Sequence, residues 1–225
     1  MRKRVAISDR RSVACDFRSP ASRLAPRASH LRFSLLTLLC AAAAACGPSV
    51  KVKPISLSDP ALSQNARRFL ADSEDAVAMT RAWRDAAAAE LSRARGREAQ
   101  LGRSAGSFSG DARALEALEA FSKLGRANSA LAGSRLMLAG AELALARQKF
   151  SQVTAEIATQ HDMAIYDLET IRRRTDEARK AFDEARRAVE RERRTVEDLN
   201  TAWLKAYAAY VKSGGNPAPF WLKVE

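Results

Sequence analysis

Residues 141–212 read AELALARQKFSQVTAEIATQHDMAIYDLETIRRRTDEARKAFDEARRAVERERRTVEDLNTAWLKAYAAYVK and contain neither glycine nor proline. Apolar side chains recur along this stretch at the spacing of an α-helix. One row repeats every seven residues and is interrupted only by Glu192; its members are Leu136, Leu143, Phe150, Ile157, Ala164, Ile171, Ala178, Ala185, Leu199 and Ala206. A seven-residue repeat keeps side chains on one helix face, so the stretch predicts a long helix with a coiled-coil seam.

A second apolar row joins the first in the later half: Leu168, Thr175, Phe182, Val189, Val196, Trp203 and Tyr210. An earlier companion row is displaced from it: Ala132, Ala139, Ala146 and Val153. The seam therefore shifts near Ala164. We expect a helix over about 128–212, of which Ala141 to Lys212 alone would span about 100 Å. Two arrangements remain open: the helix kinks and folds back, or its far part pairs with another chain.

Two shorter helices are expected before it, over about 60–101 and 111–124. Asp59-Pro60 is typical of a helix start, with Asp59 as the cap. The segment 102–110, GRSAGSFSG, predicts a break, and Gly125 predicts an end or a kink. Residues 127–140 are rich in small side chains, which predicts either close approach of another helix or a weak hinge.

The first helix carries an apolar row that we expect to be buried: Leu62, Ala66, Phe69, Ala76, Trp83, Ala87 and Leu91. Because only a short break separates it from the next helical segment, the two predict an antiparallel hairpin. The fold class is therefore all-α, with a helical hairpin or coiled coil and an extended late helix. The helical domain is expected over 59–212.

The chain ends in SGGNPAPFWLKVE, residues 213–225. Gly214 or Gly215 is expected to take the left-handed conformation that ends a helix. The remaining tail is short and apolar, with Phe220, Trp221 and Leu222 in succession. It predicts packing back onto the helices or, alternatively, docking of a partner.

The amino-terminal segment differs in composition from the rest. Residues 1–45 hold nine of the 38 Lys and Arg residues and two of the 26 Asp and Glu residues, so most of the formal charge of +12 lies there. Residues 33–45, FSLLTLLCAAAAA, form an uncharged apolar run. A basic stretch before a short apolar run is typical of a secretory signal, and the run is too short to span a bilayer.

The stretch Ala43-Ala44-Ala45-Cys46 resembles the lipobox of bacterial lipoproteins. The resemblance implies a diacylglyceryl group on the Cys46 thiol and cleavage just before it, because small residues such as Ala44 and Ala45 fit the signal peptidase. Ala43 stands where leucine is commoner. Cys40 fits less well because Leu39 precedes it. Residues 1–45 are then a signal peptide, and 46–58 a lipid-anchored flexible tether.

Two other interpretations of this segment stay open: a signal cut after Ala-x-Ala without lipidation, and an uncleaved anchor. If cleavage occurs before Cys46, Cys15 and Cys40 are lost with the signal. The mature chain then has no second cysteine for a disulfide or a cysteine metal site. It is also only mildly basic, which removes the main argument for a nucleic-acid partner.

No catalytic, cofactor-binding or metal-binding residue is expected. The sequence has no glycine-rich phosphate loop, zinc signature or Gly-x-Ser-x-Gly motif. His161 has no second histidine or cysteine at ligand spacing. Acidic residues alternate with arginines, as in 186–198, which is typical of a solvated helix face with ion pairs.

These observations favour a non-enzymatic envelope protein that serves as a helical scaffold, spacer or interaction module. The membrane, through the lipid on Cys46, and a helical protein partner or a second copy are the expected partners. Gly47 after the cysteine favours the periplasmic face of the outer membrane, by resemblance to lipoprotein sorting in enteric bacteria. A chaperone-like periplasmic protein and a cytoplasmic nucleic-acid-binding coiled coil are the alternatives.

Overall fold

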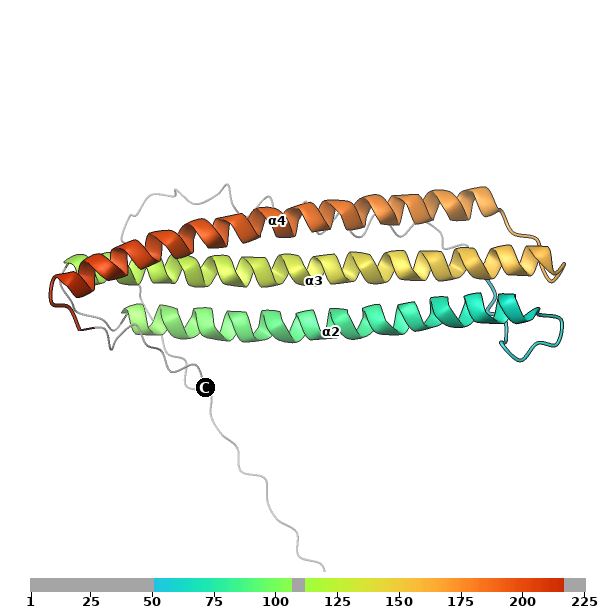
Figure 1. Ribbon diagram of the computed structural model, residues 1–225, viewed down its shortest axis with the longest axis horizontal. Helices are drawn as coiled ribbons and strands as arrows, with labels where there is room; N and C mark the ends of the chain where they lie inside the picture. Colours follow the sequence, from blue (N-terminus) through green and yellow to red (C-terminus); the bar gives the residue numbers. More distant parts are fainter. Residues whose placement is uncertain (1–50, 107–111, 217–225) are drawn as a thin grey trace, which may run out of the picture. The chain divides into compact units, whose positions relative to one another are not determined.

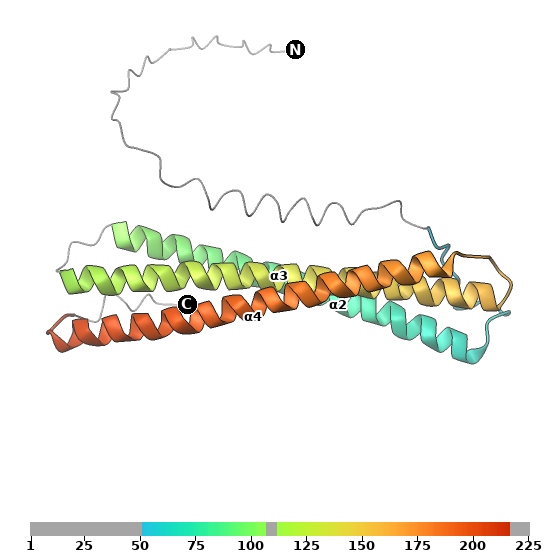
Figure 2. The same ribbon diagram turned by 90° about the horizontal axis from the view of Figure 1, so that it is seen from above.

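The computed structural model describes residues 51–106 and 112–216. They form three long helices, α2 (Gln64–Gly106), α3 (Ala112–Gln160) and α4 (Leu168–Lys212), and contain no strand. The expected all-α fold class is therefore confirmed. α3 packs against both α2 and α4, whereas α2 and α4 barely touch. Figures 1 and 2 accordingly show α3 between the other two helices.

The three helices have similar lengths of 43, 49 and 45 residues. At about 1.5 Å per residue, each is roughly 65–75 Å long. Consecutive helices run antiparallel, and the predicted hairpin of the first two is confirmed (Figure 1). The matched lengths allow α3 to be covered by a neighbour along most of both sides.

The composition of each helix fits its place. Ten of the 49 residues of α3 are charged, against 21 of the 45 residues of α4. α3 buries side chains on opposite faces: Leu143 and Leu145 are both buried, as are Ala155 and Ile157. Residues two apart point about 200° away from each other on a helix, so a helix buried in this way needs apolar residues nearly all round.

The predicted seam of α4 is confirmed from Leu168 to Tyr210. Every member of the two apolar rows within α4 is buried or half-buried, and Glu192 occupies its place in the seam half-buried. Ile171 and Tyr210, at opposite ends of the helix, are only 2% and 6% exposed. This seam packs on α3, and the remaining faces of α4 carry the charges.

The expected continuous helix over 128–212 is wrong, because residues 161–167 separate α3 from α4. Of the two arrangements left open by the sequence, the chain folds back, and α4 packs on α3. The backbone N–H of Met163 donates to the carbonyl of Ala158 (2.9 Å), and that of Asp162 donates to Thr159 (3.3 Å). Asp162 has a φ of 52°. This is the Schellman arrangement that ends helices. The seam shift near Ala164 thus marks a reversal of the chain rather than a change in supercoiling.

α4 begins with a side-chain cap. Asp167 Oδ1 accepts a hydrogen bond from the backbone N–H of Thr170 (3.1 Å), and Asp167 Oδ2 accepts one from the Thr170 hydroxyl (2.6 Å). These hydrogen bonds from Thr170 hold the pKa of the Asp167 carboxyl below its usual value. The turn contains neither glycine nor proline. Asp162 instead ends α3, and Asp167 begins α4.

The first helix begins later than expected, at Gln64 rather than Pro60. The carboxylate of Asp59 accepts from the N–H of Ala61 (3.0 Å), which closes a turn instead of starting a helix. Ser63 Oγ accepts from the N–H of Ala66 (3.2 Å) and is the actual cap. At its other end α2 continues past Leu101 to Gly106.

The expected break at Gly125 and the hinge over 127–140 are wrong, because α3 is continuous from Ala112 to Gln160. The other interpretation of 127–140 fits: Ala132 and Ala139 are buried in the bundle. Small residues here let a neighbouring helix come close. The glycines within α3 lower its helix propensity without ending it.

The buried face of α2 agrees only in part with the expected row: five of the seven residues are buried or half-buried, but the two aromatic ones are exposed. Phe69 and Trp83 are 63% and 49% exposed, whereas Leu70, Thr80 and Ala94 are buried. Thr80 is tolerated there because its hydroxyl donates to the carbonyl of Ala76 (2.9 Å) within the same helix. Because Thr80 is polar, it is absent from the expected row, whereas the two aromatic residues are wrongly included in it.

The end of α4 follows the prediction. Gly214 has a φ of 86°, as expected for the left-handed residue after a helix. The ring of Tyr210 lies so close to Gly215 that a Cβ on Gly215 would be 2.3 Å from the ring. The Tyr210 hydroxyl donates to the carbonyl of Asn216 (3.1 Å). Beside it, the rings of Phe121 and Trp203 stack with centroids 5.0 Å apart. The start of α3 is thereby fastened to the end of α4.

Candidate functional site

The residue with the most specific predicted chemistry, Cys46, lies outside the described residues, as do Asp111 and the tail 217–225. The nearest described part of the expected tether contacts the helices. The backbone N–H of Lys53 donates to the Tyr166 hydroxyl (3.0 Å), and Ile55 packs on the cluster of Leu62, Ala66, Leu70 and Ile157. The contacts thus begin within residues that were expected to be a flexible tether.

The helices themselves are not membrane spans. Among the described residues, no helix combines the length and the apolar character needed to cross a bilayer.

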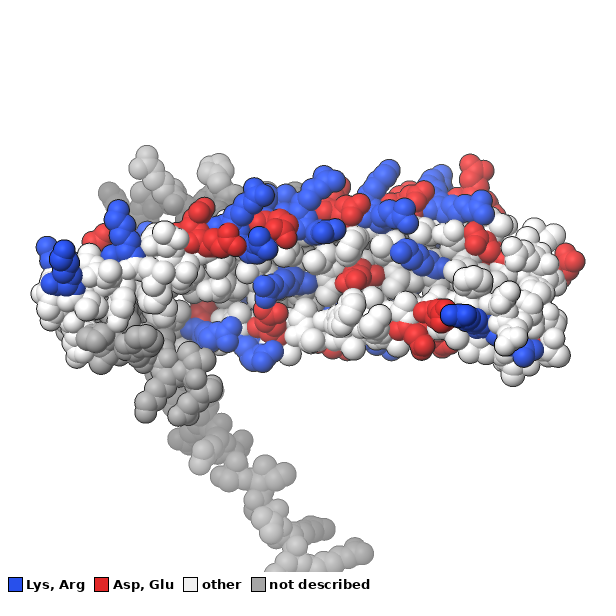
Figure 3. All heavy atoms as spheres, viewed as in Figure 1, with Lys and Arg blue, Asp and Glu red and all other residues white. Residues whose placement is uncertain are grey.

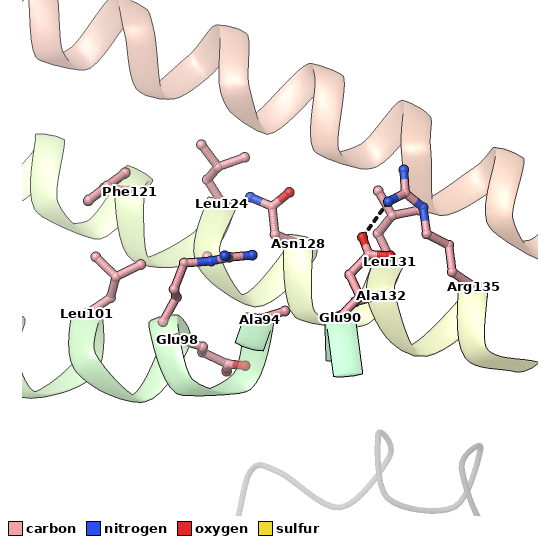
Figure 4. A pocket seen from close by; sticks show the side chains of 12 residues that line it. Glu90, Ala94, Glu98, Leu101, Phe121, Leu124, Asn128, Leu131, Ala132 and Arg135 are labelled. Carbon is pink, nitrogen blue, oxygen red and sulfur yellow. Dashed lines mark hydrogen bonds and ion pairs between the residues drawn. The ribbon is translucent and has the colours of Figure 1, made fainter. Parts of the chain in front are cut away.

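A groove of about 340 Å³ between α2 and α3 is a candidate binding surface (Figure 4). Its apolar wall is formed by Ala94 and Leu101 from α2 and by Phe121, Leu124, Gly125, Leu131 and Ala132 from α3. The groove forms where the helices approach closely: a Cβ on Gly125 would lie 2.6 Å from Leu101 Cδ1. Only a residue without a side chain fits at that point without movement of Leu101.

The polar side chains of the groove are balanced in charge. Glu90 from α2 faces Arg135 from α3, and the two form an ion pair, marked in Figure 4. Arg97, Glu98 and Asn128 complete the lining. Two carboxylates and two guanidiniums leave no net charge to attract a strongly charged ligand. The groove offers apolar contact and a few hydrogen-bonding groups, which suits a protein segment better than a phosphate or a metal ion.

Other titratable groups serve structural roles. A hydrogen bond and the charge of Lys123 lower the pKa of the Glu119 carboxyl, but this pair lies one turn apart on the surface of α3. His161 lies at the end of α3. No group of three potential metal ligands comes together within 51–106 and 112–216.

The outward faces of α4 carry the predicted alternation of charge. Figure 3 shows Lys and Arg side chains interleaved with Asp and Glu along this helix. Arg193 pairs with Glu190 and Glu197 on the same helix, and Arg172 reaches across to Glu156 of α3 (3.1 Å). The interleaved acidic residues reduce the potential that this helix presents to a polyanion.

Sequence reasoning missed the groove and found only one of its signals, the small residues of 127–140. Gly125 was a second, ambiguous signal: it lies in close contact with Leu101 of α2, but other glycines of α3 have no such neighbour. A scan of the chain against models of known families finds no match, and no curated protein or solved structure matches it either.

Proposed function

We propose that this chain is a lipid-anchored, non-enzymatic helical scaffold of the cell envelope, held at the periplasmic face of the outer membrane. The observation that carries the proposal is the signal-like segment ending in Ala44-Ala45-Cys46, followed closely by an all-helical body. A thioether-linked lipid would supply the anchor, and the helices would supply the binding surfaces.

The contact of Lys53 with Tyr166 limits how far the helices could lie from a membrane that holds the lipid on Cys46. Seven peptide bonds separate Cys46 from Lys53, whose backbone N–H is bonded to Tyr166. Extended chain spans at most about 3.6 Å per residue, so the lipid would hold this end of the helices within roughly 25 Å of the membrane. The opposite end could then present surfaces several tens of Å away, since each helix is about 65–75 Å long.

The charge distribution favours this function over the nucleic-acid-binding alternative. α4 has 12 basic and nine acidic residues, and they are interleaved rather than segregated. Nucleic-acid-binding helices usually carry a basic face that neutralises several phosphates. A protein partner is therefore the better match to these surfaces.

The anchor is tested by expressing the full chain in bacteria with radiolabelled palmitate and separating the extract by detergent partitioning. The wild-type chain should carry label and enter the detergent phase. Cys46→Ser should lose the label and accumulate as an unprocessed precursor. Both acyl chains of a diacylglyceryl group are ester-linked, so mild alkali, which cleaves esters, should release the label that they carry.

Cys40→Ser is the matched control, because Cys40 is the neighbouring cysteine in the same apolar stretch. It should leave labelling and processing unchanged. If Cys46→Ser retains the label, or if the wild-type chain carries none and stays in the aqueous phase, the lipoprotein proposal is wrong.

A further inference from the structure

The side of α2 that faces away from α3 carries exposed apolar residues. Among the described helices, α2 packs almost entirely on α3. Away from that interface, Met79 and Trp83 are 52% and 49% exposed. Exposed alanines surround them on the same side: Ala82, Ala86 and Ala89. A tryptophan and a methionine among small residues form a typical helix-docking surface, since the small residues let a second helix approach.

This surface has opposite charges at its two ends. Asp75 lies on one side of the apolar centre, and Arg93 lies on the other. Asp75 and Arg93 are 18 residues apart, which is five helical turns, so they lie on one line along α2. We call these two charged residues, with Met79, Ala82, Trp83, Ala86 and Ala89, the α2 outer face.

These two charges have no ionic partner nearby. Asp75 and Arg93 form no ion pair with any residue of 51–106 and 112–216. Arg93 Nε donates to the carbonyl of Ala89 in its own helix (3.4 Å), which leaves its charge without an acidic partner. The charges at both ends of the face are therefore available to a partner.

We propose that the α2 outer face pairs with the same face of a second copy, with the two α2 helices antiparallel. A two-fold axis near residue 84 places Asp75 opposite the partner's Arg93. This pairing occurs twice, because a two-fold interface is isologous. Met79 then meets the partner's Ala89, and Ala82 meets the partner's Ala86. A parallel pair would instead set aspartate against aspartate and arginine against arginine.

The symmetry is what identifies the second copy as the partner. Asp75 and Arg93 are equally distant from the centre of the apolar patch, so one surface complements itself. The inference does not depend on the proposed lipid anchor, because none of these residues is near Cys46 in the sequence and the pairing needs no membrane.

The test uses the full chain with Cys15, Cys40 and Cys46 changed to serine, so that neither lipid nor disulfide contributes. Its mass is measured by sedimentation in a mild non-ionic detergent over about 0.1–100 μM, a range that brackets micromolar affinity. The chain should be dimeric in the upper part of this range. Asp75→Arg and Arg93→Asp should each weaken the dimer by at least about tenfold, because each creates two like-charge contacts.

Two combinations should restore the dimer. The double variant Asp75→Arg/Arg93→Asp should dimerise within about threefold of the unchanged chain, since both ion pairs re-form in reverse. A mixture of the two single variants should form heterodimers. Asp176→Arg, a charge reversal on α4, is the matched control and should have no effect.

The apolar centre is tested with Trp83→Ala, which should abolish dimerisation without lowering helix content by circular dichroism. Leu204→Ala is its control, because Leu204 is equally exposed, at 49%, but lies on α4. A chain that stays monomeric at 100 μM overturns the proposal. Single charge reversals that leave the dimer intact, or that are not rescued by each other, overturn the antiparallel α2 interface.

Discussion

Asp162 and Gly214 occupy equivalent positions at the ends of α3 and α4. Each is the left-handed residue that follows a helix, with φ values of 52° and 86°. In both places two backbone N–H groups return to carbonyls of the last turn. Glycine adopts this conformation without strain, whereas a residue with a Cβ does not. The same motif is thus built once from a favourable residue and once from an unfavourable one.

We therefore expect opposite effects from two substitutions. Asp162→Gly should raise the free energy of unfolding by about 1 kcal/mol, because it relieves the left-handed strain and removes a negative charge from a helix carboxyl end. Gly214→Ala should lower it by about 1 kcal/mol. Urea denaturation followed by circular dichroism measures both. Destabilisation by Asp162→Gly would mean that the aspartate side chain contributes more than its backbone conformation costs.

At the scale of the helix, α3 shows why glycine is an ambiguous signal. Gly125, Gly133 and Gly140 all lie inside it without ending it. Their surroundings differ: a Cβ at Gly125 would meet Leu101, while nothing lies within 4 Å of a Cβ at Gly133 or Gly140. Only the first of the three is required by close packing with α2.

Replacement by alanine should distinguish these glycines. Gly133→Ala and Gly140→Ala should each stabilise the protein by about 0.8–1 kcal/mol, because alanine favours the helix and meets no neighbour. Gly125→Ala should gain less, since Leu101 must move to make room. Thermal and urea unfolding of the three variants provide the comparison. Equal gains at all three positions would show that the contact between Leu101 and Gly125 has no energetic weight.

At the scale of the whole bundle, the layered arrangement gives the three helices different numbers of packed sides. α3 is packed on two sides, while α2 and α4 are each packed mainly on one. Local opening of an outer helix exposes only its own interface with α3. Opening of α3 breaks both interfaces and therefore costs more free energy.

Amide hydrogen exchange should reveal this order. The slowest-exchanging amides should lie in the middle of α3, and those in the middle of α2 should exchange faster, because α2 is packed mainly on one side. Mass spectrometry of peptic fragments measures this difference. Matching protection in all three helices would mean that the bundle opens only as a single unit.

The sequence by itself determined the features that depend on neighbours along the chain. The α4 seam from Leu168 to Tyr210, the left-handed glycine at 214 and the α2–α3 hairpin follow from helical periodicity and turn residues, which are local properties. The Cys46 prediction also rests on a local motif alone. An apolar row broken only by Glu192 leaves one face on which α4 can pack.

The tertiary structure decided the features for which local preference is weak or misleading. Residues 161–167 contain neither glycine nor proline. The chain reversal there is stabilised by contacts of Met163 and Tyr166 with residues distant in the sequence. On α2 both faces are partly apolar, so propensity does not choose between Phe69 and Thr80. Packing against the small residues of α3 decides which face of α2 is buried. Close approach of two helices depends on the shapes of both surfaces, and the sequence of one helix describes only its own surface.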